Sequence, residues 1–211
     1  MSGISAQGST LSVSTGTGGV KNITAIAVGN PTILTIAAHA LGNGDVVTLA
    51  ALTGTDAALL NGQSLVVTNK TANTIAVNID TTGKVVTIGA GTATPVSFTK
   101  INGVVSYSGL DGAPSELDTT DLDSTAMEYI SGLVDEGKFG FEVKTINTDA
   151  GQLALRAART SGAVKSIKLV FPDAVVATFN VLVKSFPVAG GVNAILKRSV
   201  DTKITGPVVW S

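Results

Sequence analysis

The sequence contains no cysteine and only one histidine, His39, and these two shortages exclude several kinds of site. Without thiols, the fold can use neither disulfide bonds nor a metal site built from thiolates. A single imidazole cannot supply the several histidines of a typical zinc centre unless subunits share the metal. A Ser-His-Asp triad would depend on His39, and no Gly-x-Ser-x-Gly segment presents a serine for it. We therefore interpret His39 as a loop-edge residue and expect no enzyme.

Charged side chains are also scarce, and long apolar runs are missing. Charged residues make up 14% of the chain, against roughly 25% in a typical domain. Apolar residues make up 44% and the formal net charge is −1, so the chain is too hydrophobic for disorder and has little charge to keep copies apart. No apolar run approaches the roughly 20 residues of a membrane-spanning helix, so we expect no membrane partner. These properties favour a protein that associates with other proteins.

The first half of the chain has the composition of β-structure. Residues 1–110 contain seven charged side chains, none of them Glu or Arg, and are rich in Thr, Val and Ile. Short apolar runs alternate with turn signals, as in a small antiparallel sandwich or barrel. The expected strands are Ile23–Val28, Ile33–Ala37, Asp45–Ala50, Ser64–Thr68 and Thr74–Ile79. Farther on, Asn102-Gly103 between Phe98–Ile101 and Val104–Tyr107 predicts a β-hairpin.

Residues 111–137 form a distinct segment with eight acidic residues and no basic one. Within it, Thr125 followed by Glu128 fits a capping box. This pattern predicts a short helix that passes through Tyr129 and ends at Gly132.

The remaining residues predict strands around one longer helix. The helix runs over Asp149–Ser161, with Asp149 as its cap and Gly162 at its end. Its apolar face consists of Leu153, Ala154, Ala157 and Ala158. Strands are expected over Lys138–Thr145, Ala163–Phe171, Val175–Phe186 and about Ala194–Ile204. In the first of these, every second residue from Phe139 to Val143 is apolar, as in a half-buried strand.

Charge is divided unevenly along the chain. Residues 1–110 carry a formal charge of +1, residues 111–137 carry −8, and residues 138–211 carry +6. Two explanations are open. The acidic segment could neutralise the basic one within a molecule, or it could project and dock on the basic domain of a neighbouring copy, where ion pairs would fix the register between subunits.

Other motifs give weak signals for chemistry. Asp118–Ser124 has carboxylates for a loose calcium site, but counted from Asp121 the sixth residue is Ala126, where an EF-hand loop has Gly. Two of these carboxylates could form a glycosidase pair, but the chain has only one Trp and two Tyr to bind a sugar. Gly16–Gly19 lacks the Lys of a phosphate-binding loop, and no basic-aromatic cluster predicts specific nucleic-acid binding. We expect neither a cofactor nor a metal site.

Several stretches resemble one protein family. Residues 103–211 resemble the major tail tube proteins of lambda-type siphophages. The most specific stretch is Ser115–Ala126, with a Thr-Asp-Leu-Asp-Ser core, and Tyr129–Gly137 follows with the Gly-Leu and Asp-x-Gly elements. Further elements similar to the family are Phe171-Pro172-Asp173, Lys184-Ser185-Phe186, the ending Lys203–Ser211 and a first strand at Gly8–Val13.

The resemblance implies a mainly β fold, a tail-tube β-sandwich or barrel with one packed α-helix. The tail tube domain would be discontinuous, consisting of residues 1–20 and 97–211. Residues 21–96 look like a small all-β, sandwich-like module that is inserted in many phage virion proteins, and it would be displayed outside the tube.

The resemblance also implies a structural virion protein that self-assembles into stacked rings, usually hexameric, and forms the conduit for genome delivery. Its partners would be other copies of itself, a tape-measure protein, tail-tip and terminator proteins, and double-stranded DNA in non-specific transit. It would assemble in the host cytoplasm and reside in the virion tail. Because each Lys or Arg in the lumen would bind phosphate and slow the DNA, we expect a neutral to acidic lumen.

In this family, the connection that corresponds to Asp111–Gly137 reaches neighbouring subunits or rings. The expected subunit-contact residues are Glu116, Asp118, Asp121, Leu122, Asp123, Tyr129, Ile130, Leu133 and Asp135. A competing interpretation is a virion decoration or baseplate module that recognises a host surface glycan. Such a module would form closed oligomers rather than tubes.

Overall fold

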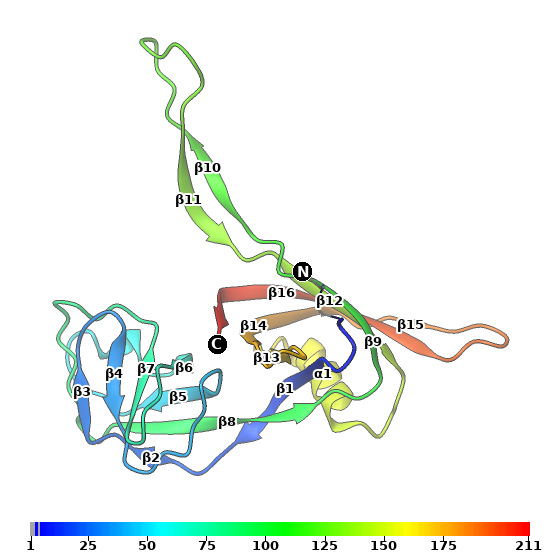
Figure 1. The fold of residues 1–211 in the computed structure, drawn as a ribbon, viewed down its shortest axis with the longest axis horizontal. Helices are drawn as coiled ribbons and strands as arrows, with labels where there is room; N and C mark the ends of the chain where they lie inside the picture. Colours follow the sequence, from blue (N-terminus) through cyan, green and yellow to red (C-terminus); the bar gives the residue numbers. More distant parts are fainter. Residues whose placement is uncertain (1–2, 4) are drawn as a thin grey trace.

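The computed structural model describes Gly3 and residues 5–211, and within them the chain is mainly β (Figure 1). Met1, Ser2 and Ile4, which belong to the expected 1–20 segment, lie outside this description. One group of strands consists of β2 (Lys21–Asn22), β3 (Ala25–Ala27), β4 (Thr32–Thr35), β5 (Val46–Ala50), β6 (Ser64–Thr68) and β7 (Thr74–Val77), with the short 3₁₀ helix η1 (Ala57–Leu59). The others are β1 (Thr10–Thr17), β8 (Thr92–Lys100), β9 (Val104–Gly109), β10 (Ala113–Asp118), β11 (Tyr129–Asp135), β12 (Lys138–Lys144), β13 (Lys165–Val170), β14 (Val176–Ser185), β15 (Val188–Ala189) and β16 (Lys197–Trp210), with the helix α1 (Ala150–Ser161).

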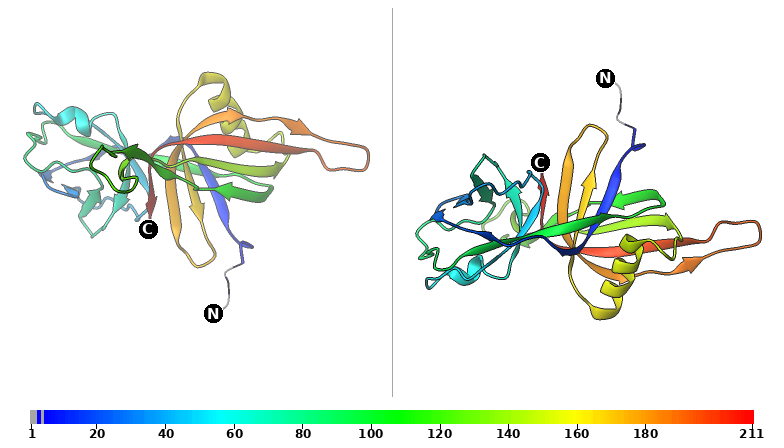
Figure 2. Two further views of the ribbon diagram at one scale, coloured as in Figure 1. Left: turned by 90° about the horizontal axis from the view of Figure 1, so that it is seen from above. Right: turned by 90° about the horizontal axis from the view of Figure 1, so that it is seen from below.

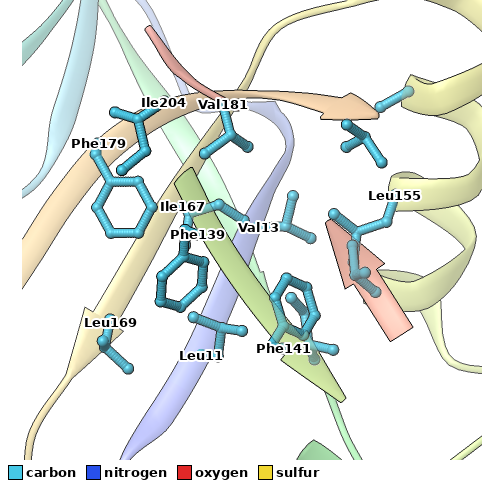
Figure 3. Packing of buried hydrophobic residues seen from close by; sticks show 14 of the residues in the cluster. Leu11, Val13, Phe139, Phe141, Leu155, Ile167, Leu169, Phe179, Val181 and Ile204 are labelled. Atoms are coloured by element: carbon cyan, nitrogen blue, oxygen red, sulfur yellow. The ribbon is translucent and has the colours of Figure 1, made fainter. Parts of the chain in front are cut away.

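Buried apolar side chains among the described residues gather in two separate clusters. The larger cluster lies between α1 and the strands β1, β12, β13, β14 and β16, and it includes Phe139, Leu155 and Phe179 (Figure 3). The rings of Phe139 and Phe179 meet edge to face with 5.1 Å between centroids, a favourable aromatic geometry. The smaller cluster is formed by β4–β7 and the start of β8 and includes the fully buried Leu34 and Leu49. Each part of the chain therefore has its own core.

The strand β8 connects the two parts. Its first half, Thr92–Pro95, pairs with β5, and its second half, Val96–Lys100, pairs with β1; both pairings are antiparallel. Thr17 and Val96 lie opposite each other in this register, so the chain leaves the larger part and returns to it at adjacent points. Figure 2 shows β2–β7 on one side of this connection and the part that contains α1 on the other.

A tight contact at Gly44 and Asp45 joins the two parts. The Lys168 ammonium group donates a hydrogen bond to the Asp45 carboxylate at 2.9 Å, and the Thr178 hydroxyl donates to the Gly44 carbonyl at 3.0 Å. Gly44 has a φ of +81°, and a Cβ there would lie 2.8 Å from the Ser211 hydroxyl oxygen. The positive φ therefore favours glycine at this position.

His39 lies in the loop between β4 and β5, but it is buried rather than at the loop edge. Its Nδ1 accepts a hydrogen bond from the Leu41 N–H at 3.0 Å, and its Nε2 lies 3.0 Å from the Thr71 carbonyl oxygen. Since Nδ1 is an acceptor, Nε2 carries the proton and donates to Thr71. The imidazole thus satisfies backbone groups of two loops and has a structural role.

The expected hairpin at Asn102-Gly103 is wrong, although the turn itself is present. The flanking strands do not pair with each other: β8 pairs with β1 and β5, and β9 pairs with β12. The turn binds the start of α1 instead, because Asn102 Nδ2 donates to the Asp149 carboxylate at 2.7 Å and the Asn102 carbonyl accepts from Gln152. These tertiary contacts override the local hairpin preference, and β9 lies at one end of the strand order, beside β12.

The expected helix is confirmed as α1, with both of its end signals. The Asp149 carboxylate accepts a hydrogen bond from the Gln152 N–H at 2.9 Å, and Gly162 ends the helix with a φ of +69°. The buried face differs from the prediction, since Leu153 and Ala157 are exposed. The residues that are buried instead are Gly151, Gln152, Leu155 and Ala158.

Gln152 is the residue that shifts the buried face of α1. Its Nε2 donates to the carbonyls of Asn102 and Lys144, both at 2.9 Å, and its Oε1 accepts from the Ile146 N–H at 3.1 Å. A buried amide costs little when its donors and acceptor are all satisfied in this way. The helix start is therefore fixed to the turn between β8 and β9 and to the end of β12 with the loop after it.

Most of the other expected strands are present with small shifts of their ends. β12 buries Phe139, Phe141 and Val143 as the alternation predicts, and β6 has the expected bounds. β5, β7, β13 and β14 fall within their predicted ranges, whereas β4 begins one residue before its predicted range, at Thr32. β16 is longer than predicted, since it continues past Ile204 to Trp210 and pairs there with the start of β14.

Candidate subunit-contact hairpin

The acidic segment forms a β-hairpin that projects from the body of the molecule (Figure 1). β10 and β11 pair antiparallel, with Leu117 opposite Ile130 and Asp118 opposite Tyr129. The short helix expected to end at Gly132 is therefore wrong. No other strand is paired with β10 or β11 among the described residues, so the hairpin has no second layer.

Hydrogen bonds across the hairpin explain why the capping-box pattern does not start a helix. The Glu128 N–H donates to the Thr120 hydroxyl at 3.0 Å, and the Glu128 carbonyl accepts from the Thr119 N–H at 2.9 Å. Thr119 and Thr120 thus bind the backbone groups that a helix would have used. The cross-strand contacts extend the β10–β11 ladder beyond Asp118 toward the tip.

The tip of the hairpin is a turn stabilised by one aspartate. Asp121 Oδ1 accepts hydrogen bonds from the Asp123 N–H at 2.9 Å and from the Ser124 hydroxyl at 3.2 Å. The turn leaves Leu122 fully exposed between the carboxylates of Asp121 and Asp123. A leucine in this setting contacts only water in the isolated chain.

Apolar side chains are exposed along the whole hairpin. They are Leu117, Leu122, Met127, Tyr129, Ile130, Leu133 and Val134. An isolated two-stranded hairpin is marginally stable in water, and a set of exposed apolar side chains of this size marks a surface for association. Leu117, Met127 and Val134 were not among the contact residues expected from the sequence. The sequence predicted a short helix in this segment, and the exposure of these three side chains follows only from the hairpin.

The charge on the hairpin is almost wholly unpaired within the molecule. Among the described residues, the ion pairs are Lys168–Asp45, Lys197–Glu142 and Lys203–Asp135. Only Asp135 belongs to the acidic segment, and it lies at the hairpin base. The described part of the chain thus gives little support to neutralisation within one molecule.

The nine expected contact residues all lie on this hairpin, but they do not form one compact site. Asp121, Leu122 and Asp123 lie at the tip, whereas Asp135 lies at the base. The others are distributed along the two strands, namely Glu116, Asp118, Tyr129, Ile130 and Leu133. The hairpin therefore offers an elongated surface. At its tip the carboxylates and Leu122 are exposed and form no ion pair with a described residue, whereas at its base Asp135 is paired with Lys203.

Two carboxyl groups of the hairpin have a lowered pKa. The hydrogen bond from Lys203, at 2.6 Å, lowers the pKa of Asp135, with help from the Gly137 N–H. Hydrogen bonds from Thr120 lower the pKa of Asp118. Both groups therefore stay ionised to a lower pH than an ordinary aspartate does.

No group of three or more His, Cys, Asp or Glu is arranged to hold a metal ion within Gly3 and residues 5–211. Asp118 and Asp121 accept hydrogen bonds from backbone N–H groups of their own turns instead. In the same described residues, no helix has the length and hydrophobicity needed to cross a membrane.

Comparisons with known proteins gave one family and several solved structures. Residues 87–211 match the family described as lambda phage tail tube protein, TTP. No curated protein is significantly similar to the chain. Solved structures that match include the tail of an empty GTA particle with C6 symmetry, at 18% identity and a TM-score of 0.47, over 54% of this chain and 86% of that chain. The six-fold symmetrised baseplate of the anti-feeding prophage matches at 11% identity and a TM-score of 0.42, over 82% of this chain and 95% of that chain.

Replacing Lys203 by alanine tests the contact at the hairpin base. Because the Lys203 hydrogen bond is the main cause of the lowered pKa of Asp135, we expect Lys203→Ala to move the Asp135 titration upward, toward its ordinary range. In the unmodified chain the contribution of this pair is present above the ordinary pKa and is lost as pH falls through the lowered value. Carboxyl carbon shifts measured by NMR across the acid range report both titrations.

The control variant for this measurement is Lys197→Ala, which removes the partner of Glu142 and leaves the hairpin base intact. It should leave the Asp135 titration where it is in the unmodified chain. An unchanged Asp135 titration in Lys203→Ala would contradict the described geometry.

Proposed function

The chain belongs to the lambda phage tail tube protein family, and from this membership we propose that its copies assemble into hexameric rings that stack into a tail tube. The family match, which covers residues 87–211, is the observation that carries the proposal. The family is structural, so the chain has a structural role in the phage tail tube, and its place is the virion tail. We propose no reaction for it.

The finer features of this role are also proposals. Assembly would take place in the host cytoplasm around a tape-measure protein, between tail-tip and terminator proteins. Double-stranded DNA would later pass through the lumen without sequence-specific contacts. A neutral to acidic lumen suits this transit, because basic side chains would bind the phosphates.

A free sheet edge supports the formation of rings. In the order of paired strands among the described residues, β9 is the last strand at one end, so one side of it has no strand partner. A hollow lined by Ser9, Val104 and Tyr107 runs beside this edge. Exposed edge strands are templates for pairing with another chain. We propose that a neighbouring copy in the ring pairs at β9.

We propose that residues 21–96 are an inserted module outside the tube wall. The separate apolar cluster of β4–β7 and the start of β8 supports this division. The adjacent positions of Thr17 and Val96 support it further, because a module can be inserted at such a point without disturbing the register of β1 and β8. The turn at Gly44 and Asp45 forms hydrogen bonds and an ion pair with the larger part.

Negative-stain electron microscopy of the purified, concentrated chain at moderate salt tests the proposed function. We expect hollow tubes or stacked rings, because exposed apolar side chains and low net charge favour association. The mass in solution should rise with concentration in parallel. Monomers that persist under these conditions and bind a surface glycan would instead favour the decoration or baseplate alternative.

Reversing the charge at the hairpin tip should block assembly. In Asp121→Lys with Asp123→Lys, the tip would repel the basic surface of a neighbouring copy, so we expect folded monomers by circular dichroism and no tubes by microscopy. The variant Asp121→Asn with Asp123→Asn keeps an acceptor for the turn and removes only charge, so its assembly should be intermediate. Normal tubes from the lysine variant would refute docking by the tip.

Deleting the proposed module should leave assembly intact. A chain that lacks residues 21–96, with a short Gly/Ser bridge between Val20 and Ser97, would close β1 and β8 as a hairpin. We expect tubes of reduced outer diameter with the same ring spacing. If the truncated chain folds but forms no rings, residues 21–96 belong to the tube wall.

A further inference from the structure

A shallow hollow lies between α1 and the strands that end near it. Its apolar lining comes from Ile146, Leu153 and Phe186, and two guanidinium groups, those of Arg156 and Arg198, border it. We call these five residues the arginine notch. Ile146 and Leu153 are partly exposed, so the notch offers an accessible apolar floor between two positive charges.

The notch is held in shape by contacts already described for the start of α1. Gln152, which also lines the hollow, accepts the Ile146 N–H and donates to the Asn102 and Lys144 carbonyls. Arg198 lies over the Phe186 ring, with 5.0 Å between the guanidinium carbon and the ring centroid. A preformed site of this kind loses little side-chain entropy when a partner binds.

The charges of the notch lack partners within the molecule. Neither Arg156 nor Arg198 forms an ion pair with a described residue. A stacked arginine keeps its donors available for a carboxylate, since guanidinium groups bind carboxylates through their edges. The notch therefore fits a ligand with an apolar centre and a carboxylate on each side.

The hairpin tip has this pattern. Leu122 is fully exposed, and Asp121 and Asp123 flank it on either side. The apolar group of the tip would cover Ile146 and Leu153, and the two carboxylates would face the two arginines. Polarity and charge are thus matched between the two surfaces.

The tip cannot occupy the notch of its own chain in the described arrangement. The hairpin points away from the body of the molecule, and its tip is separated from α1 (Figure 1). From Ala113 to Leu122, an extended chain at about 3.4 Å per residue spans about 30 Å. This reach exceeds the radius of gyration of about 17 Å expected for a compact domain of this length. The hairpin is therefore long enough to contact another subunit.

We propose that the tip Asp121–Asp123 of one copy docks in the arginine notch of another copy. The proposal rests on the proposed function and identifies the surface that receives the hairpin in the assembled tube. Leu122 supplies the apolar contact, and the pairing of Asp121 and Asp123 with Arg156 and Arg198 fixes the register.

Engineered cysteines test the contact directly, because the chain has no cysteine of its own. We expect Leu122→Cys with Leu153→Cys to give a ladder of disulfide-linked multimers after mild oxidation of assembled protein. Leu122→Cys with Ile146→Cys tests the second apolar residue of the notch and should give the same ladder. The control is Leu122→Cys with Val85→Cys, since Val85 is exposed in residues 21–96 and remote from the notch; it should stay unlinked.

A charge exchange gives an independent readout. Arg156→Glu with Arg198→Glu should abolish assembly, and adding Asp121→Lys and Asp123→Lys to that variant should restore it. The control Lys70→Glu with Lys84→Glu changes the net charge equally at two exposed positions and should assemble normally.

The outcomes separate this inference from the proposed function. Tubes from the cysteine variants that remain unlinked at both notch positions would overturn the docking site and leave the proposed function standing. The same holds for normal tubes from Arg156→Glu with Arg198→Glu, or for a folded fourfold variant that stays monomeric. Failure of the unmodified chain to assemble would overturn the proposed function and the inference together.

Discussion

A two-stranded β-hairpin cannot bury its own apolar side chains, so the hairpin of this molecule needs another surface to cover them. β10 and β11 carry apolar residues without a second layer, together with a run of carboxylates of which only Asp135 is paired within the described residues. The rest of the molecule differs from the hairpin in two ways. Residues 138–211 carry an excess of positive charge, and β9 has one edge without a strand partner among the described residues. In the proposed docking, each of these surfaces on one copy would be covered by a surface of another copy. Association would then complete the packing of the fold.

The rest of the architecture serves to hold these surfaces in place. Phe139 and Phe179 anchor the larger core, Gln152 fixes the start of α1 to the neighbouring loops, and Lys203 positions the hairpin base through Asp135. The paired positions of Thr17 and Val96 allow residues 21–96 to form a separate core beside this frame. The turn at Gly44 and Asp45 is the place where a change within residues 21–96 would reach the larger part, through Thr178 and Lys168.

Much of the fold could be predicted because alternation and end signals are local properties. The alternation from Phe139 to Val143 and the Asp149 cap both led to correct elements. The failures arose where a distant residue competed for a local signal. Thr120 binds the Glu128 N–H and replaces the capping box, and Asp149 and Gln152 bind Asn102 and separate β8 from β9. The candidate residues of the acidic segment were found from charge and resemblance, but their division between a tip and a base requires the hairpin geometry. The notch was not predicted because Ile146, Phe186 and Arg198 come from separate segments that only the fold brings together.

A contact between a tip and a different surface is directional. When the tip of each copy docks on a copy in the next ring, addition of rings never uses up both kinds of surface at the growing boundary. A filament built in this way has two chemically distinct ends, one with unoccupied tips and the other with unoccupied notches. A protein that starts the filament and a protein that stops it would then need opposite recognition chemistry, one basic and one acidic, so the polarity of the whole particle would be encoded in the unequal charge of a single chain.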